Sequence, residues 1–154
     1  IQVGVGTLLA LKIYDWIRTI RPDRAKAEAF MSSFTDEAWQ EQTRRIFGKA
    51  AQAVIDAEHN QHHKNDPERQ KKHFARIEAH WDEILKIIAE ELPPTKDIAA
   101  LMASLEMPMV PADLGISAED THNAFIGSRD IRDKYLTSTM LWEMGLMYET
   151  PMPE

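Results

Sequence analysis

The chain of 154 residues has no cysteine. Disulfide bonds and thiolate metal sites are therefore excluded, and a reducing compartment, the cytoplasm, is the expected location. The chain also has few basic residues for its acidic ones: it contains 18 Lys and Arg and 25 Asp and Glu, which gives a formal net charge of −7. A nucleic-acid-binding domain is expected to carry a basic face, so we expect no nucleic-acid partner.

Long apolar runs and strand-like alternation are absent as well. A membrane-spanning helix needs about 20 consecutive apolar residues, and charges interrupt even the most apolar stretch, residues 3–20. We therefore expect no membrane partner. No segment shows sustained alternation of apolar and polar residues, so the sequence predicts no β-sheet. With 44% hydrophobic and 28% charged residues, the composition is that of a soluble globular domain.

Residues 3–20 predict an unusually apolar helix. At about 100° per residue, Lys12, Asp15 and Arg18 gather with Thr19 into an arc of roughly 120°, and apolar residues cover nearly all the rest. A surface helix usually shows a much narrower apolar face. We therefore expect an all-α domain of six to seven helices, spanning 1–154, around a largely buried first helix near its centre.

Capping and breaking residues predict where the other helices begin and end. They indicate helices over 22–32, 35–57, 67–92 and 95–106, a Pro-rich connection, and two helical segments between 117 and 145 that meet near 127–129. Asp66 and Ser117 are expected to cap the helices that follow them. The third and fourth helices look like an antiparallel hairpin with a polar tip over 58–64.

Four residues of that tip have the spacing of a metal site. Glu58 and His62, and likewise His59 and His63, are four residues apart and would share a helix face. Two imidazoles at that spacing can chelate a divalent ion. The surrounding residues are polar and offer no obvious third ligand, so we interpret the group as a solvated hairpin end and predict no native metal site.

Other candidate groups have plain interpretations. His73 and His80 are expected to be solvated boundary residues, whereas Met140, Met144 and Met147 are expected to fill the core. No phosphate-binding glycine loop and no nucleophile–base pair can be identified. From its own residues, the chain is predicted to have no catalytic site.

Residues 129–134 concentrate charge, with two arginines, two aspartates and a lysine in six positions. One interpretation is a charged helix junction whose exposed ion pairs are each worth less than about 1 kcal/mol. The other is an arginine cluster presented to a phosphate or a carboxylate, which guanidinium geometry suits. The residues alone favour the first.

Both ends of the chain resemble a known family. The stretch Val3–Leu9 with its long helix, the segment Ile131–Tyr135 followed by Leu141, Met144 and Gly145, and the phrase from Pro111 to Ile116 look like the C-terminal helical domain of glycerol-1-phosphate dehydrogenases. These enzymes belong to the superfamily of iron-type alcohol dehydrogenases and dehydroquinate synthases. Leu136 separates Tyr135 from Thr137, whereas the family tends to place Thr directly after the Tyr. This departure leaves the subfamily and the substrate open.

The resemblance implies a dehydroquinate synthase-like C-terminal domain that lacks its N-terminal nucleotide-binding domain. The parent enzyme would bind NAD(P) and a divalent metal, zinc or iron, and would transfer a hydride to or from a small phosphorylated polyol or ketone. None of the six histidines matches a family metal ligand, so no ligand transfers to this chain, and the chain alone is expected to be inactive. It would supply the pocket wall, through Gly4, Gly6 and Thr7 and through Arg129 or Arg132 near the phosphate.

Two alternatives remain open. The chain could be a stand-alone helical interaction module, or the parent could catalyse another reaction of the superfamily, such as polyol oxidation or dehydroquinate synthesis. In a chain separated from its partner domain, we also expect exposed apolar residues among Val3, Val5, Leu8 and Leu9. Such a patch would favour a homo-oligomer.

Overall fold

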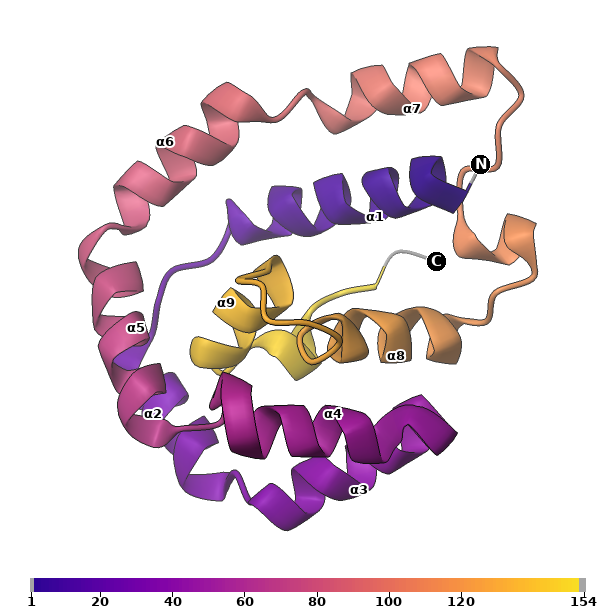
Figure 1. The fold of residues 1–154 in the computed structure, drawn as a ribbon. Helices are drawn as coiled ribbons and strands as arrows, with labels where there is room; N and C mark the ends of the chain where they lie inside the picture. Colours follow the sequence, from indigo (N-terminus) through magenta and orange to yellow (C-terminus); the bar gives the residue numbers. More distant parts are fainter. Residues whose placement is uncertain (1, 153–154) are drawn as a thin grey trace. The chain divides into compact units, whose positions relative to one another are not determined.

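The computed structural model describes residues 2–152 and is all-helical over that range, without a strand, so the predicted fold class is confirmed. The α-helices are α1 (Gln2–Ile17), α2 (Arg24–Ser33), α3 (Asp36–Phe47), α4 (Ala51–Ala57), α5 (Pro67–Ala79), α6 (Trp81–Glu91), α7 (Thr95–Ser104), α8 (Ala118–Ser128) and α9 (Thr137–Glu143) (Figure 1). None of these helices is both long enough and apolar enough to cross a bilayer.

The chain forms two compact units. The first comprises residues up to 21, residues 80–122 and residues from 150 on, and the second comprises residues 22–79 and 123–149. The prediction that 1–154 form a single domain of a longer protein stays a prediction.

In the first unit, α1 lies alongside α7 (Figure 1). Its buried side chains are Val5, Leu8, Leu11, Ile13 and Ile17. The predicted polar arc is present, because Asp15 accepts a hydrogen bond from the Thr95 hydroxyl at 2.6 Å and Arg18 donates to the Ile88 carbonyl at 3.2 Å. At about 100° per residue these five residues spread over roughly two-thirds of the helix circumference, so α1 is covered on more than one side.

The expected exposure at the start of α1 is only partly correct. Val3 is 82% exposed, but Val5 and Leu8 are 3% and 2% exposed, so the prediction was wrong for these two residues. They lie two and five positions after Val3, and a helix turns by about 100° per residue, which places them on a different side of α1. Leu9 is half-buried.

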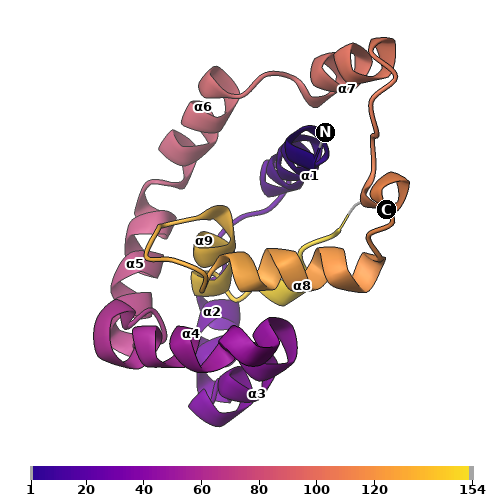
Figure 2. The same ribbon diagram turned by 45° about the vertical axis from the view of Figure 1, so that its right-hand side comes forward.

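In the second unit, the predicted helix over 35–57 is folded back on itself. Gly48 has a φ of +52°, a conformation that glycine adopts without steric cost. The chain reverses there, and α3 and α4 lie side by side (Figures 1 and 2). The helical hairpin therefore forms between α3 and α4, whereas α5 packs on α2 and α9, and the predicted pairing of 35–57 with 67–92 was wrong.

The predicted helix over 67–92 is also interrupted, at His80, which has a φ of −116° and separates α5 from α6. The predicted caps are confirmed. The carboxylate of Asp66 accepts from the backbone N–H groups of Glu68 and Arg69 at 2.7 and 3.0 Å, and the hydroxyl of Ser117 accepts from the N–H of Asp120 at 3.0 Å.

Candidate functional site

Buried charged residues gather in the second unit around the loop of residues 129–136, which joins α8 to α9. Arg129 is fully buried, and its guanidinium lies 4.0 Å from the centre of the Trp142 ring. It donates to Asp130 and to Asn65, both at 2.8 Å. Asp130 also accepts from the indole N–H of Trp39 at 3.0 Å. These five residues, the Arg129 cluster, fix the N-terminal end of the loop.

Lys64 holds the same loop through its backbone. This side chain is buried, and its Nζ donates to the carbonyl oxygens of Arg129 and Arg132 at 2.7 and 2.6 Å. Burial lowers the pKa of Lys64, and the nearby carboxylates of Asp130 and Asp133 oppose that shift. Two carbonyls three residues apart thus converge on one ammonium group, so the loop backbone is curved around it.

The C-terminal end of the loop is tied to Glu143 of α9. Glu143 is a buried carboxylate that interacts through both oxygens, with Tyr135 donating its hydroxyl at 2.6 Å and His73 of α5 approaching through Nδ1 at 2.6 Å. The backbone carbonyl of Glu143 accepts from Gln70 at 2.6 Å. These residues form the Glu143 cluster, which joins α5, α9 and the loop.

Burial dominates the electrostatics of the Glu143 cluster. It raises the pKa of Glu143, against the lowering effect of the hydrogen bonds from Tyr135 and His73. Burial, reinforced by the Glu143 charge, also raises the pKa of Tyr135 well above its ordinary value. The Nδ1 atom of His73 and a carboxylate oxygen of Glu143 lie 2.6 Å apart, and the tautomer of the ring decides which of the two donates. A carboxylate that orients an imidazole in this way also occurs in proton-transfer sites.

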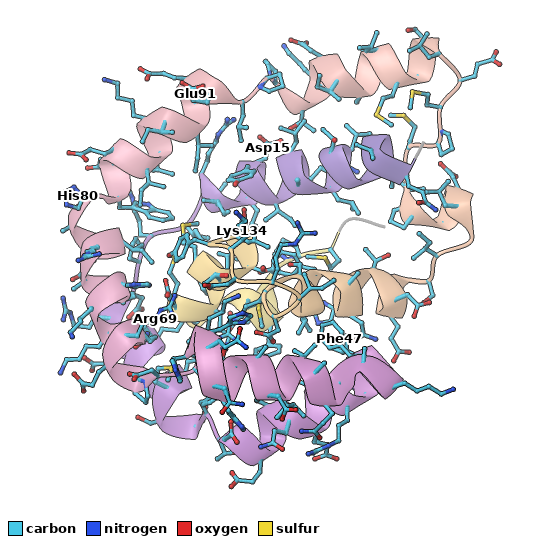
Figure 3. All side chains as sticks on the ribbon, viewed as in Figure 1. Asp15, Phe47, Arg69, His80, Glu91 and Lys134 are labelled. Atoms are coloured by element: carbon cyan, nitrogen blue, oxygen red, sulfur yellow. The ribbon has the colours of Figure 1, made fainter. Side chains whose placement is uncertain are left out.

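Between these two anchored ends, residues 131–135 are all exposed. Ile131 is 61% exposed and Tyr135 is 54% exposed. Figure 3 labels Lys134 on this loop. The loop therefore presents exposed side chains on a backbone that buried groups hold in place.

The structure separates the two arginines predicted as substrate-binding residues. Arg129 has both of its Nη atoms bonded within the protein, whereas the side chain of Arg132 is exposed. The favoured interpretation, a charged helix junction with local ion pairs, agrees with the Arg129–Asp130 pair at 2.8 Å, but the pair is buried, with side chains 1% and 8% exposed. The sequence did not indicate this burial, which depends on the Trp142 ring of α9 against the guanidinium.

Gly4, Gly6 and Thr7 lie on α1 in the first unit. A Cβ on Gly4 would lie 3.1 Å from the methyl groups of both Met102 and Met107, so close packing accounts for this glycine. A Cβ on Gly6 would meet nothing within 4 Å, so packing does not account for Gly6. Thr7 is exposed and its hydroxyl donates to the Val3 carbonyl at 2.9 Å.

The histidine-rich segment does not form the predicted solvated end throughout. Residues 58–62 adopt a π-helical turn, which changes the four-residue register, and Glu58 is buried and accepts from the backbone N–H of Asn65 at 2.6 Å. His59 pairs with Asp36 at 2.9 Å. Over residues 2–152 there is no group of three His, Cys, Asp or Glu side chains placed to hold a metal.

The remaining predictions have mixed outcomes. His73 lies at the boundary of the core as predicted, with its side chain 26% exposed, but its ring pairs with Glu143 instead of being only solvated. His80 is exposed as predicted, and Met140, Met144 and Met147 are buried as predicted.

Sequence reasoning missed Lys64, Glu143 and Tyr135 as parts of one arrangement. Glu143 did leave a signal, because it is a single acidic residue inside the apolar run from Met140 to Met144, and a charge in such a run is expected to be paired. Lys64 gave no such signal, because its neighbours in the sequence are polar and a lysine among polar residues is expected to be exposed.

No family model matches the chain, and no curated protein or solved structure is significantly similar to it.

Proposed function

We propose that this chain is the C-terminal helical part of an NAD(P)-dependent oxidoreductase similar to glycerol-1-phosphate dehydrogenases, and that it is inactive on its own. The observation that carries the proposal is the resemblance of Val3–Leu9 and Ile131–Tyr135 to that family, in a chain whose described part contains helices and no strand. The absence of cysteine agrees with a cytoplasmic location, which we include in the proposal.

The described residues do not fit the metal centre of the parent enzyme. Residues 2–152 contain no set of three side chains that could hold zinc or iron. No glycine-rich nucleotide loop was found in the sequence. The metal ligands, an Asp and two His, would lie upstream of Ile1, and the NAD(P) site would belong to the nucleotide-binding domain. No reaction step is assigned to this chain.

The proposed role of this chain is to form part of the substrate pocket wall. Arg132 is the stronger of the two candidate phosphate-binding arginines, because its side chain is exposed while Lys64 fixes its backbone carbonyl at 2.6 Å. Arg129 would act as a positioning residue, since its guanidinium is buried and both of its Nη atoms donate within the protein. Gly6 and Thr7 are exposed candidates on α1, where a glycine without close neighbours permits the approach of another molecule.

The test is the coding sequence upstream of Ile1 and the protein expressed from the whole gene. We expect a glycine-rich nucleotide motif, then an Asp and two spaced His, and metal-dependent reduction of dihydroxyacetone phosphate. In that protein, Arg132→Ala should raise KM for dihydroxyacetone phosphate with a smaller effect on kcat, and Lys96→Ala, a charge removal on α7, should change neither. Turnover by the 154-residue chain alone, or an upstream region without these motifs, would contradict the proposal. If the whole-gene protein preferred a polyol or the substrate of dehydroquinate synthesis, the parent enzyme would be assigned to another reaction of the same superfamily.

A second candidate function is a stand-alone helical interaction module. It is favoured by exposed apolar side chains of the first unit, where Leu101 and Leu105 of α7 are 56% and 62% exposed and Val3 is 82% exposed. Under this proposal the patch mediates self-association into a homo-oligomer. Analytical ultracentrifugation of the chain and of Leu101→Asp/Leu105→Asp tests it, and a monomer at all concentrations would reject it.

A further inference from the structure

The loop of residues 129–136 is held by an unusual number of buried charged groups. Arg129, Asp130, Lys64 and Glu143 are all buried, and each of them contacts the loop or forms part of it. Desolvating charges is costly, and apolar residues of similar volume often stabilise a fold equally well or better. What such a network can provide is a defined conformation, because each hydrogen bond restricts the relative position of the two groups that it joins. The network therefore specifies the shape of the loop.

The side chains that this backbone presents are both apolar and charged. Ile131 is an apolar residue that is 61% exposed, and Tyr135 contributes an aromatic ring that is 54% exposed. Arg132 and Lys134 are exposed on either side of Asp133 in the sequence, and the negative charge of Asp133 acts to raise the pKa of Lys64. Arg132 and Lys134 make no side-chain hydrogen bond or ion pair with the described residues. An apolar centre with unpaired charges beside it has the core-and-rim composition of protein interfaces.

We propose that residues 131–135 form a preorganised recognition loop that docks on an acidic protein surface, with Ile131 entering an apolar pocket and Arg132 and Lys134 pairing with carboxylates at its rim. Charge complementarity selects the partner. A lipid headgroup surface is recognised by clusters of about four to eight basic residues, and a nucleic acid requires a basic face, which a chain of net charge −7 does not offer here. Two cations beside one apolar side chain suit a small acidic site on a protein.

Fixing the loop before binding lowers the entropy lost on association, and this is the advantage of the Lys64 and Glu143 contacts. The inference does not depend on the proposed function. Arg132 is, however, also the residue through which that function would reach a phosphate. Competition by inorganic phosphate therefore distinguishes the two roles.

The first measurement concerns the preorganisation. Backbone ¹⁵N relaxation of the 154-residue chain should give residues 131–135 order parameters as high as those of α9, and Tyr135→Phe, which removes only the hydroxyl bonded to Glu143, should lower them. Order parameters below about 0.6 in the unaltered chain indicate a flexible loop and would overturn the proposal.

The second measurement concerns the partner chemistry. The probe is a displayed library of random dodecapeptides selected on the immobilised chain, and we expect enriched peptides with an apolar residue flanked by Asp or Glu. Binding of these peptides should fall at least about tenfold with Ile131→Asp and with Arg132→Glu/Lys134→Glu, as for interface hot spots. The matched changes Ile87→Asp on α6, where Ile87 is 58% exposed, and Lys96→Glu on α7 should leave it within about twofold, below the level at which a residue counts as a hot spot.

Three outcomes would reject the recognition loop: no enrichment of acidic peptides, equal losses in the loop variants and the control variants, or displacement of the peptides by millimolar inorganic phosphate. The last outcome would identify the loop as a small-anion site and would leave the proposed function standing. Failure of the whole-gene protein to reduce dihydroxyacetone phosphate, in contrast, would leave the peptide result unaffected.

Discussion

The buried ammonium of Lys64 provides the sharpest test of how the loop is held. Lys64→Met keeps a long unbranched side chain but removes the donor to the carbonyls of Arg129 and Arg132, at 2.7 and 2.6 Å. Hydrogen bonds from a charged group are worth about 1.5–3 kcal/mol each. The variant also escapes the desolvation of a buried charge, which offsets part of the loss. We expect a net destabilisation of about 2–4 kcal/mol, close to the range for breaking a buried charged pair.

Urea denaturation of the chain and of Lys64→Met measures this difference, and hydrogen exchange locates it. Protection should fall most at the amides of residues 129–134, whereas α3 should lose protection only through the global change. Lys71→Met, an exposed lysine of α5, is the matched control and should stay within about 0.5 kcal/mol. A Lys64→Met variant as stable as that control would show that the two carbonyl contacts do not hold the loop.

The other predictions concern the charge of Glu143, the positive φ of Gly145, and His59 and His63. Burial raises the pKa of Glu143 in the folded state, so this residue favours the fold below its ordinary pKa of 4.5 and loses that contribution as pH rises through the raised pKa. Urea denaturation should therefore show that Glu143→Gln gains stability relative to the unaltered chain between pH 4.5 and pH 7. A stability difference that does not change with pH would contradict this. Gly145 has a φ of +73°, and a Cβ there would lie 2.9 Å from the Cβ of Phe30. Gly145→Ala should therefore lower the free energy of unfolding by about 1–3 kcal/mol. An unchanged Tm would refute this prediction. Zinc calorimetry should show only weak binding that His59→Ala/His63→Ala removes without loss of Tm, and a submicromolar site would reveal a structural metal.

The helical character and most helix starts were predictable because they depend on local chemistry. Asp66 and Ser117 cap helices through bonds to residues two or three positions away, so the signal lies entirely within a few residues. The reversal at Gly48 was missed for the opposite reason. Apolar residues recur at helical spacing on both sides of it, and the periodicity does not show whether the chain continues straight or folds back.

The contrast between Arg129 and Arg132 shows why the candidate site was harder to predict than the fold. These arginines are three residues apart in one charged segment, and nothing local separates a buried one from an exposed one. The difference comes from residues distant along the chain. The guanidinium of Arg129 donates to Asn65 and lies over the Trp142 ring, whereas Lys64 bonds only the backbone carbonyl of Arg132. Burial of Arg129 and exposure of Arg132 are consequences of the same packing. A substitution that releases Arg129 should therefore also free the backbone that presents Arg132. If residues 131–135 bind a partner as proposed, such a substitution should weaken that binding although Arg129 itself does not contact the partner.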